Sequence, residues 1–82
     1  MSYEKVTQAS DVVIGTKQTM KALRAGQIRE LVIAEDANIH ILDDVLAIAR
    51  QSKVPVSKVD SMQKLGKACG IDVGASAVAI KV

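Results

Sequence analysis

Three cationic side chains are spaced so that a helix would place them on one face. Lys17, Lys21 and Arg24 stand at positions i, i+4 and i+7, which span an arc of roughly 60° on an α-helix. No Asp or Glu occurs between residues 12 and 29, whereas most surface helices interleave charges of both signs. This basic face suits a polyanion such as a nucleic-acid backbone, although an ordinary solvated face would explain it equally well.

The start of the same segment favours anions for a second reason. The first N–H groups of a helix are free, and the positive end of the helix dipole attracts negative charge. Gly15 precedes the helix, followed by Thr16, and a glycine lets another molecule approach the backbone closely. The segment is not a nucleotide-binding phosphate loop, because the glycine spacing that such a loop has before its Lys is absent.

A second candidate segment is the loop Ile71-Asp72-Val73-Gly74, which is unusually apolar for an exposed turn. Two interpretations remain open. The loop could be packed onto the core, or it could form an apolar ledge that contacts a group of a partner.

Residues for catalysis or metal binding do not come together in the sequence. Cys69 is the only cysteine and His40 the only histidine, too few for a disulfide or a zinc site. Asp43 and Asp44 are adjacent and would point in different directions, which makes them a poor acid/base pair. No nucleophile has a base and an orienting partner. We therefore expect no enzyme, no cofactor and no metal.

The composition is that of a single small folded domain. The chain has 82 residues, of which 49% are hydrophobic and 24% charged, so we expect one domain over residues 1–82. Tyr3 is the only aromatic residue, which excludes folds that stack bases on aromatic side chains. With one cysteine, no long apolar segment and a polar N-terminus, we expect a cytoplasmic protein without a membrane partner.

Charge is unevenly distributed along the chain, whose net charge is +2. Residues 1–29 hold five cations and two acids, residues 30–60 six acids and three cations, and residues 61–82 three cations and one acid. A molecule with one basic side could meet a polyanion, with the acidic middle segment turned away from it.

Helices and strands are expected to alternate. The expected helices are 3–9 with Ser2 as cap, 16–25, 38–51 with Ile39 and Ile41 on its apolar side, and a short helix from the cap Ser61 to Ala68; the expected strands are 11–14, 30–35, 55–59 and 76–82. The unbroken aliphatic run at 30–35 indicates a strand buried on both faces. The fold class predicted is α/β, a three-layer α/β/α sandwich around a small mixed, mostly parallel four-stranded sheet.

Two motifs resemble a known family. Residues 14–22 (IGTKQTMKA) resemble the start of the RNA-binding helix in the ribosomal proteins that bind kink turns, the L-seven-Ae/L-thirty-e family. Residues 65–71 (LGKACGI), followed by 77–80 (AVAI), resemble that family's C-terminal signature. The resemblance covers essentially the whole chain. The length and the Lys17-Gln18 pair are most similar to the small bacterial members.

The resemblance implies recognition of a kink turn, an RNA duplex bent at a three-nucleotide bulge beside tandem sheared G·A pairs. It implies that Lys17 and Gln18 meet base edges. Lys21 would meet a base edge or a phosphate, and Arg24 a phosphate. The backbone of Gly15 and Thr16 would approach closely, and the loop from Ile71 through Asp72 and Val73 to Gly74 would pack under a nucleotide flipped out of the bulge.

Archaeal members of the family usually have Asn-Glu where this chain has Lys17-Gln18. Good phosphate attraction and a weaker or different base readout are therefore expected. A lone domain with one basic face indicates a monomer. The resemblance implies that its partner is structured RNA with kink turns, either ribosomal RNA or a riboswitch-like RNA. The alternative is a protein-interaction or ribosomal packing module without independent RNA specificity.

Overall fold

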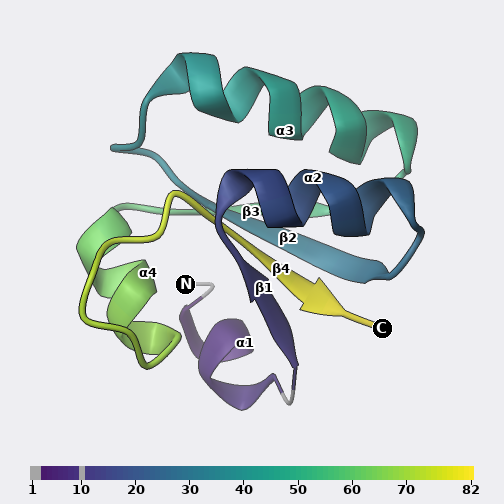
Figure 1. Ribbon diagram of the computed structural model, residues 1–82. Helices are drawn as coiled ribbons and strands as arrows, with labels where there is room; N and C mark the ends of the chain where they lie inside the picture. The colour runs from purple at the N-terminus through teal and green to yellow at the C-terminus, as the bar shows by residue number, and fades with distance from the viewer. Residues whose placement is uncertain (1–2, 10) are drawn as a thin grey trace.

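The computed structural model describes residues 3–9 and 11–82 (Figure 1). Helices and strands alternate, which confirms the expected order. The elements are α1 (Tyr3–Gln8), β1 (Val12–Ile14), α2 (Thr16–Arg24), β2 (Ile28–Ala34), α3 (Ile39–Gln51), β3 (Val56–Val59), α4 (Met62–Ala68) and β4 (Ala77–Lys81). The cap expected at Ser2 lies outside the described residues.

Local sequence signals explain where the helices begin and end. The Asn38 side chain accepts the His40 N–H at 2.9 Å and caps α3. The Ser61 hydroxyl accepts the Lys64 N–H at 3.2 Å and caps α4, as predicted. Both side chains satisfy N–H groups that a helix leaves free in its first turn. Gly26 follows α2 with φ at 71°, a left-handed conformation that glycine adopts without strain.

The prediction of a mostly parallel sheet was wrong. The strand order is β1-β4-β2-β3, and only β2 and β3 are parallel. The last strand, β4, lies antiparallel between β1 and β2, with Val12 opposite Ile80 and Leu31 opposite Ala79. The aliphatic run of β2 requires a strand that is buried on both faces. A central strand in a mixed sheet is buried in this way when helices cover both sides of the sheet, just as it is in a parallel sheet.

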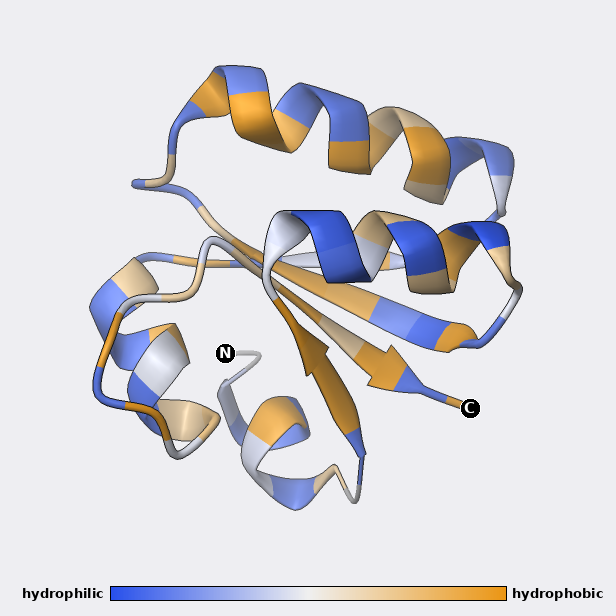
Figure 2. Cartoon of the chain, in the orientation of Figure 1, coloured by the Kyte–Doolittle hydropathy of each residue, from blue (hydrophilic) through white to orange (hydrophobic). Residues whose placement is uncertain are grey.

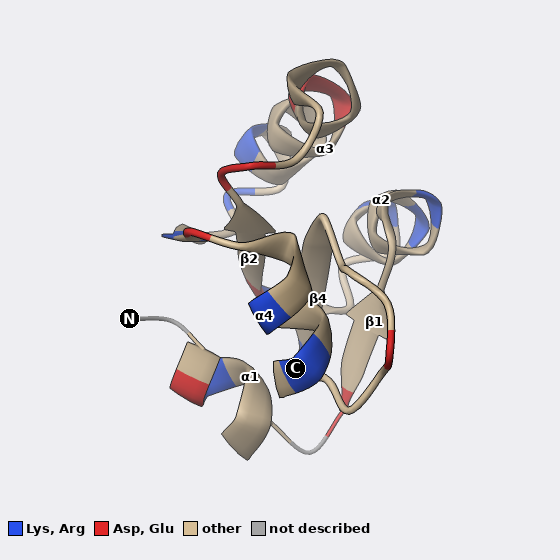
Figure 3. Ribbon diagram, turned by 90° about the vertical axis from the view of Figure 1, so that its left-hand side faces the viewer, with Lys and Arg blue, Asp and Glu red and all other residues tan. Residues whose placement is uncertain are grey.

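Helices cover both faces of the sheet, which confirms the three layers. Helices α2 and α3 lie side by side on one face, and α1 and α4 lie on the other (Figures 1 and 3). The apolar strands lie between these layers (Figure 2). The largest fully buried apolar side chains of the core are those of Leu23, Leu31, Val32, Val45, Val59, Leu65, Val78 and Ile80. The core is aliphatic, as the composition required.

The apolar side of α3 is narrower than predicted. Leu42, Val45 and Ala49 are buried, but Ile39 and Ile41 are 66% and 45% exposed. Residues at i, i+3 and i+7 share one face of a helix. That face of α3 is buried, and Leu46 and Ile48 beside it are partly buried against the core. No helix in the described ranges is long and apolar enough to cross a membrane.

Candidate nucleic-acid interface

The junction between β1 and α2 is open and its backbone is fixed. Gly15 has φ at 98° and ψ at 151°, a conformation that other residues rarely adopt. Its N–H donates to the Ala77 carbonyl at 3.1 Å, and its carbonyl accepts the Thr19 N–H at 3.0 Å. Apart from Gly15 itself and its two chain neighbours, no described residue has an atom within 4 Å of the position that a Cβ on Gly15 would occupy. A ligand can therefore reach the backbone at the start of α2.

Helix α2 divides into a buried and an exposed side, as the spacing predicted. Thr19, Ala22 and Leu23 are buried against the core. The three cations of the basic face and Gln18 are all exposed, and Thr16 is partly buried. None of these cations forms an ion pair within the described residues. The basic face is therefore available to an external anion.

The structure brings the apolar loop 71–74 to the same end of the molecule as the start of α2. The loop joins α4 to β4, and the Ala77 carbonyl at the start of β4 is the acceptor for the Gly15 N–H. In Figure 1 the loop lies at the far left and α2 begins at the left end of that helix, and Figure 3 views the molecule from this side. Val73 is 69% exposed, Asp72 and Gly74 are also exposed, and Ile71 is partly buried. The loop is thus a ledge that is exposed from residue 72 to residue 74 and partly buried at Ile71.

Gly66 holds the apolar loop in place, a role that sequence analysis missed. The glycine is buried in α4, and a Cβ there would overlap the Val73 carbonyl. The Ile71 N–H donates to the Gly66 carbonyl at 3.1 Å, and the Ala75 N–H donates to the Met62 carbonyl at 3.0 Å. The loop backbone therefore lies directly on α4. Gly66 stands within the quoted motif, and only its neighbour across space shows why glycine is required.

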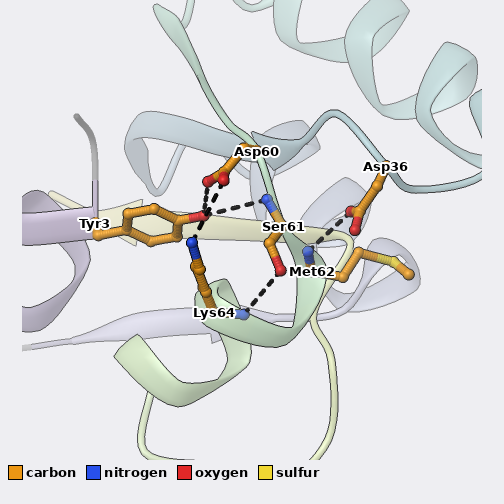
Figure 4. A network of polar contacts seen from close by, with 6 residues as sticks. All are labelled: Tyr3, Asp36, Asp60, Ser61, Met62 and Lys64. Atoms are coloured by element: carbon orange, nitrogen blue, oxygen red, sulfur yellow. Dashed lines mark hydrogen bonds and ion pairs between the residues drawn. The ribbon is translucent and has the colours of Figure 1, made fainter.

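A polar network fixes the start of α4, the helix that carries the loop (Figure 4). The Tyr3 hydroxyl donates to the Asp60 carboxylate and accepts the Ser61 N–H at 3.1 Å. The Asp36 carboxylate accepts the Met62 N–H at 2.8 Å. Segments from three parts of the chain thus position one short helix.

The contacts in this network shift the pKa values of Asp60 and Tyr3 in opposite directions. The Tyr3 hydrogen bond, partly opposed by desolvation, lowers the pKa of Asp60, and Lys64 adds to that lowering from 3.5 Å away. Desolvation and the adjacent Asp60 carboxylate raise the pKa of Tyr3. The ionised carboxylate and the neutral phenol are therefore the favoured pair.

At the other end of α4, Cys69 is partly buried against the core. This burial raises the pKa of its thiol.

The arrangement suits binding rather than chemistry. Within residues 3–9 and 11–82, no group of three metal-ligating side chains comes together. The functional groups at this end are ammonium, guanidinium, amide and backbone N–H donors beside an apolar ledge. Such donors meet phosphates and base edges, and an apolar ledge can meet the face of a base.

Comparison with known proteins decides the family. The model of the ribosomal protein L7Ae/L30e/S12e/Gadd45 family matches residues 2–82. The chain belongs to this family. The family assignment confirms the resemblance of the two motifs.

Relatives of similar length are close in sequence. The RNA-binding protein YbxF of Geobacillus stearothermophilus is 61% identical over 80 residues, which are 98% of each chain. An RNA-binding protein of Geobacillus thermodenitrificans is 60% identical with the same coverage. A more distant RNA-binding protein of Staphylococcus aureus is 42% identical over 82 residues, again 98% of each chain. These names describe a family of binding proteins, which confirms that the chain is not an enzyme.

Solved structures share the fold. A protein of unknown function from Bacillus halodurans superposes with a TM-score of 0.84 at 26% identity, over 98% of this chain and 80% of that one. A 15.5 kD RNA-binding protein of Giardia lamblia gives a TM-score of 0.84 at 24% identity, over 98% and 68% of the two chains. At that identity the second likeness supports the fold alone.

Proposed function

We propose that this protein binds RNA and that it recognises and stabilises kink turns. The observation that supports this is the juxtaposition of two unlike surfaces at one end of the molecule. The exposed basic face and open start of α2 lie beside the exposed apolar loop, linked through the bond from Gly15 to Ala77. The relatives named as RNA-binding proteins support the first part of the proposal.

In this proposal the start of α2 enters the major groove where sheared G·A pairs open it. Ordinary A-form RNA keeps that groove too narrow for side chains. Lys17 donates to guanine acceptors, and Gln18 uses both its amide donor and its carbonyl acceptor on a base edge. Lys21 binds a phosphate or a base edge, and Arg24 binds a phosphate.

The apolar loop has a complementary task. Val73, 69% exposed on a loop anchored to Gly66, offers an apolar surface to the face of an unstacked nucleotide. Asp72 is exposed beside it, and its charge directs phosphates away from the loop and toward α2. A kink turn presents both partners at once, since its bulge supplies the unstacked nucleotide and its G·A pairs supply the open groove.

Stabilisation of the kinked form needs only differential affinity. An RNA that interconverts between kinked and extended forms shifts toward the form that binds the protein more tightly. No catalytic step is required.

The test is a binding titration at fixed salt with two RNAs. One RNA has a kink turn with tandem G·A pairs, and the other has Watson–Crick pairs in their place. Tight binding to the first RNA alone is expected. Equal affinity for both would overturn kink-turn recognition and leave the basic face as a general polyanion contact. If binding to both is also weakly dependent on salt, the alternative of a protein-interaction module is favoured instead.

A further inference from the structure

We propose that the RNA footprint extends beyond the start of α2 into a hollow that binds a phosphate of the flanking stem, with Lys81 as its second cation. This inference rests on the proposed function. The hollow has a volume of about 280 Å³ and lies between α2 and the strands β1 and β4. The residues that line it are Val13, Gln18, Lys21, Ala22, Ala25, Gln27 and Lys81.

The lining has the chemistry of a sugar–phosphate site. Three of the lining side chains are small and apolar, those of Val13, Ala22 and Ala25, and a ribose can lie against them. The other four are two cations and two amides, all of which can donate hydrogen bonds to phosphate oxygens. No carboxylate lines the hollow within the described residues.

The rim of the hollow is held by backbone hydrogen bonds. The Val82 N–H donates to the Gln27 carbonyl at 2.9 Å, and the Lys81 N–H donates to the Asp11 carbonyl at 3.1 Å. These bonds join the end of β4 to the turn after α2 and to the residue before β1. The backbone of Lys81 is therefore fixed beside α2, so that no backbone has to be ordered there when a phosphate binds.

The hollow is continuous with the proposed base-reading residues. Gln18 and Lys21 stand at i and i+3, so they share one side of α2, and both line the hollow. In the proposed complex, an RNA strand whose base contacts Gln18 continues with one or more phosphates on either side of that base. One of these phosphates would enter the hollow, which RNA bound to the basic face alone would leave empty.

Asp11 sets the strength of this site. Its carboxylate lies 3.6 Å from the Lys81 ammonium, and the Asp11 side chain is 67% exposed. An exposed pair of this kind is weak, so a phosphate can replace the carboxylate as partner. Asp11 therefore competes with RNA for Lys81, and changes at the two positions should have opposite effects on affinity.

The experiment measures the affinity for the kink-turn RNA at several salt concentrations, for the wild type and for Lys81→Ala, Lys81→Arg and Asp11→Asn. Lys81→Ala is expected to bind about two- to fivefold more weakly at low salt and to reduce the slope of log K against log salt by about one. Lys81→Arg should retain the slope, and Asp11→Asn should bind more tightly. Lys53→Ala, which lies outside the hollow and the basic face, serves as the matched control.

A second arm shortens each of the two stems of the RNA in turn. The effect of Lys81→Ala should vanish with one shortened stem and persist with the other. The inference is wrong if Lys81→Ala leaves both affinity and slope unchanged, or if Lys81→Arg loses as much as Lys81→Ala, which would indicate a structural role. Failure of the wild type to prefer the kink turn would instead refute the proposed function.

Discussion

The carbonyl oxygen of Val73 occupies the space that a side chain on Gly66 would need. The loop backbone crosses α4 at this point and is tied to the helix on both sides, by the Ile71 N–H on the Gly66 carbonyl at 3.1 Å and the Ala75 N–H on the Met62 carbonyl at 3.0 Å. The exposed position of Val73 therefore depends on a residue that is itself buried.

Gly66→Ala should displace the apolar loop from α4. Because the overlap is with backbone and not with a flexible side chain, the loop must move, and overpacking of this kind costs about 1–3 kcal/mol. We expect a lower free energy of unfolding, measured by denaturant titration, and weaker binding of the kink-turn RNA by the folded variant.

Ala49→Gly is the control for lost stability. Ala49 is fully buried in α3, far along the chain from the loop, and glycine inside a helix costs about 1 kcal/mol. Its folded form should bind RNA like the wild type. Equal RNA affinity of Gly66→Ala and Ala49→Gly would show that the loop is not part of the interface.

Lys17→Ala and Gln18→Ala should each weaken binding of the kink-turn RNA by about 1–3 kcal/mol, the usual range for a lost base-edge contact. Both side chains are exposed on the first turn of α2, so the free energy of unfolding should barely change. Lys53→Ala, within the acidic middle segment, should have little effect. Equal losses at all three positions, measured by titration at fixed salt, would argue against a localised site.

Tyr3→Phe should lower stability within a defined range of pH. The pKa of Asp60 lies below its ordinary value of 3.8, so its ionised form contributes stability at higher pH, and that contribution is lost as pH falls through the lowered pKa. The pKa of Tyr3 lies above 10.0, so the contribution of the neutral phenol is lost as pH rises through the raised pKa.

The stability difference between the wild type and Tyr3→Phe should therefore be largest near neutral pH and shrink toward both extremes. Denaturation at a series of pH values measures it. A difference that is constant from acid to alkaline pH would show that the Tyr3 hydroxyl does not interact with the charge of Asp60. Asp60→Asn is the companion variant and should remove most of the acid dependence.

Thr19→Val should leave stability unchanged or raise it. Thr19 is fully buried on α2, and its hydroxyl oxygen has no hydrogen-bond partner among the described residues. Valine has nearly the same shape and no hydroxyl to desolvate, and the cost of an unsatisfied buried group is about 1–3 kcal/mol. The free energy of unfolding tests this. A clear loss of stability would mean that the hydroxyl has a partner in solution, such as a bound water.

Much of the local structure could be predicted from the sequence. The helix cap Ser61 and the stop at Gly26 act on neighbours within a few residues, so their effects follow from residue type and spacing. The division of α2 into buried and exposed sides followed from the helical period for the same reason. These features determined the order of the elements and the exposure of the basic face.

Only the tertiary structure decided the strand directions and the neighbours across space. An aliphatic strand such as β2 can have parallel or antiparallel neighbours, because a central strand is buried on both faces in either arrangement. In this fold β4 lies between β1 and β2 and is antiparallel to both. The contacts of Gly15 with Ala77 and the shared hollow of Gln18 and Lys81 join residues more than sixty positions apart. Such pairs depend on how the layers pack, so spacing along the chain does not reveal them.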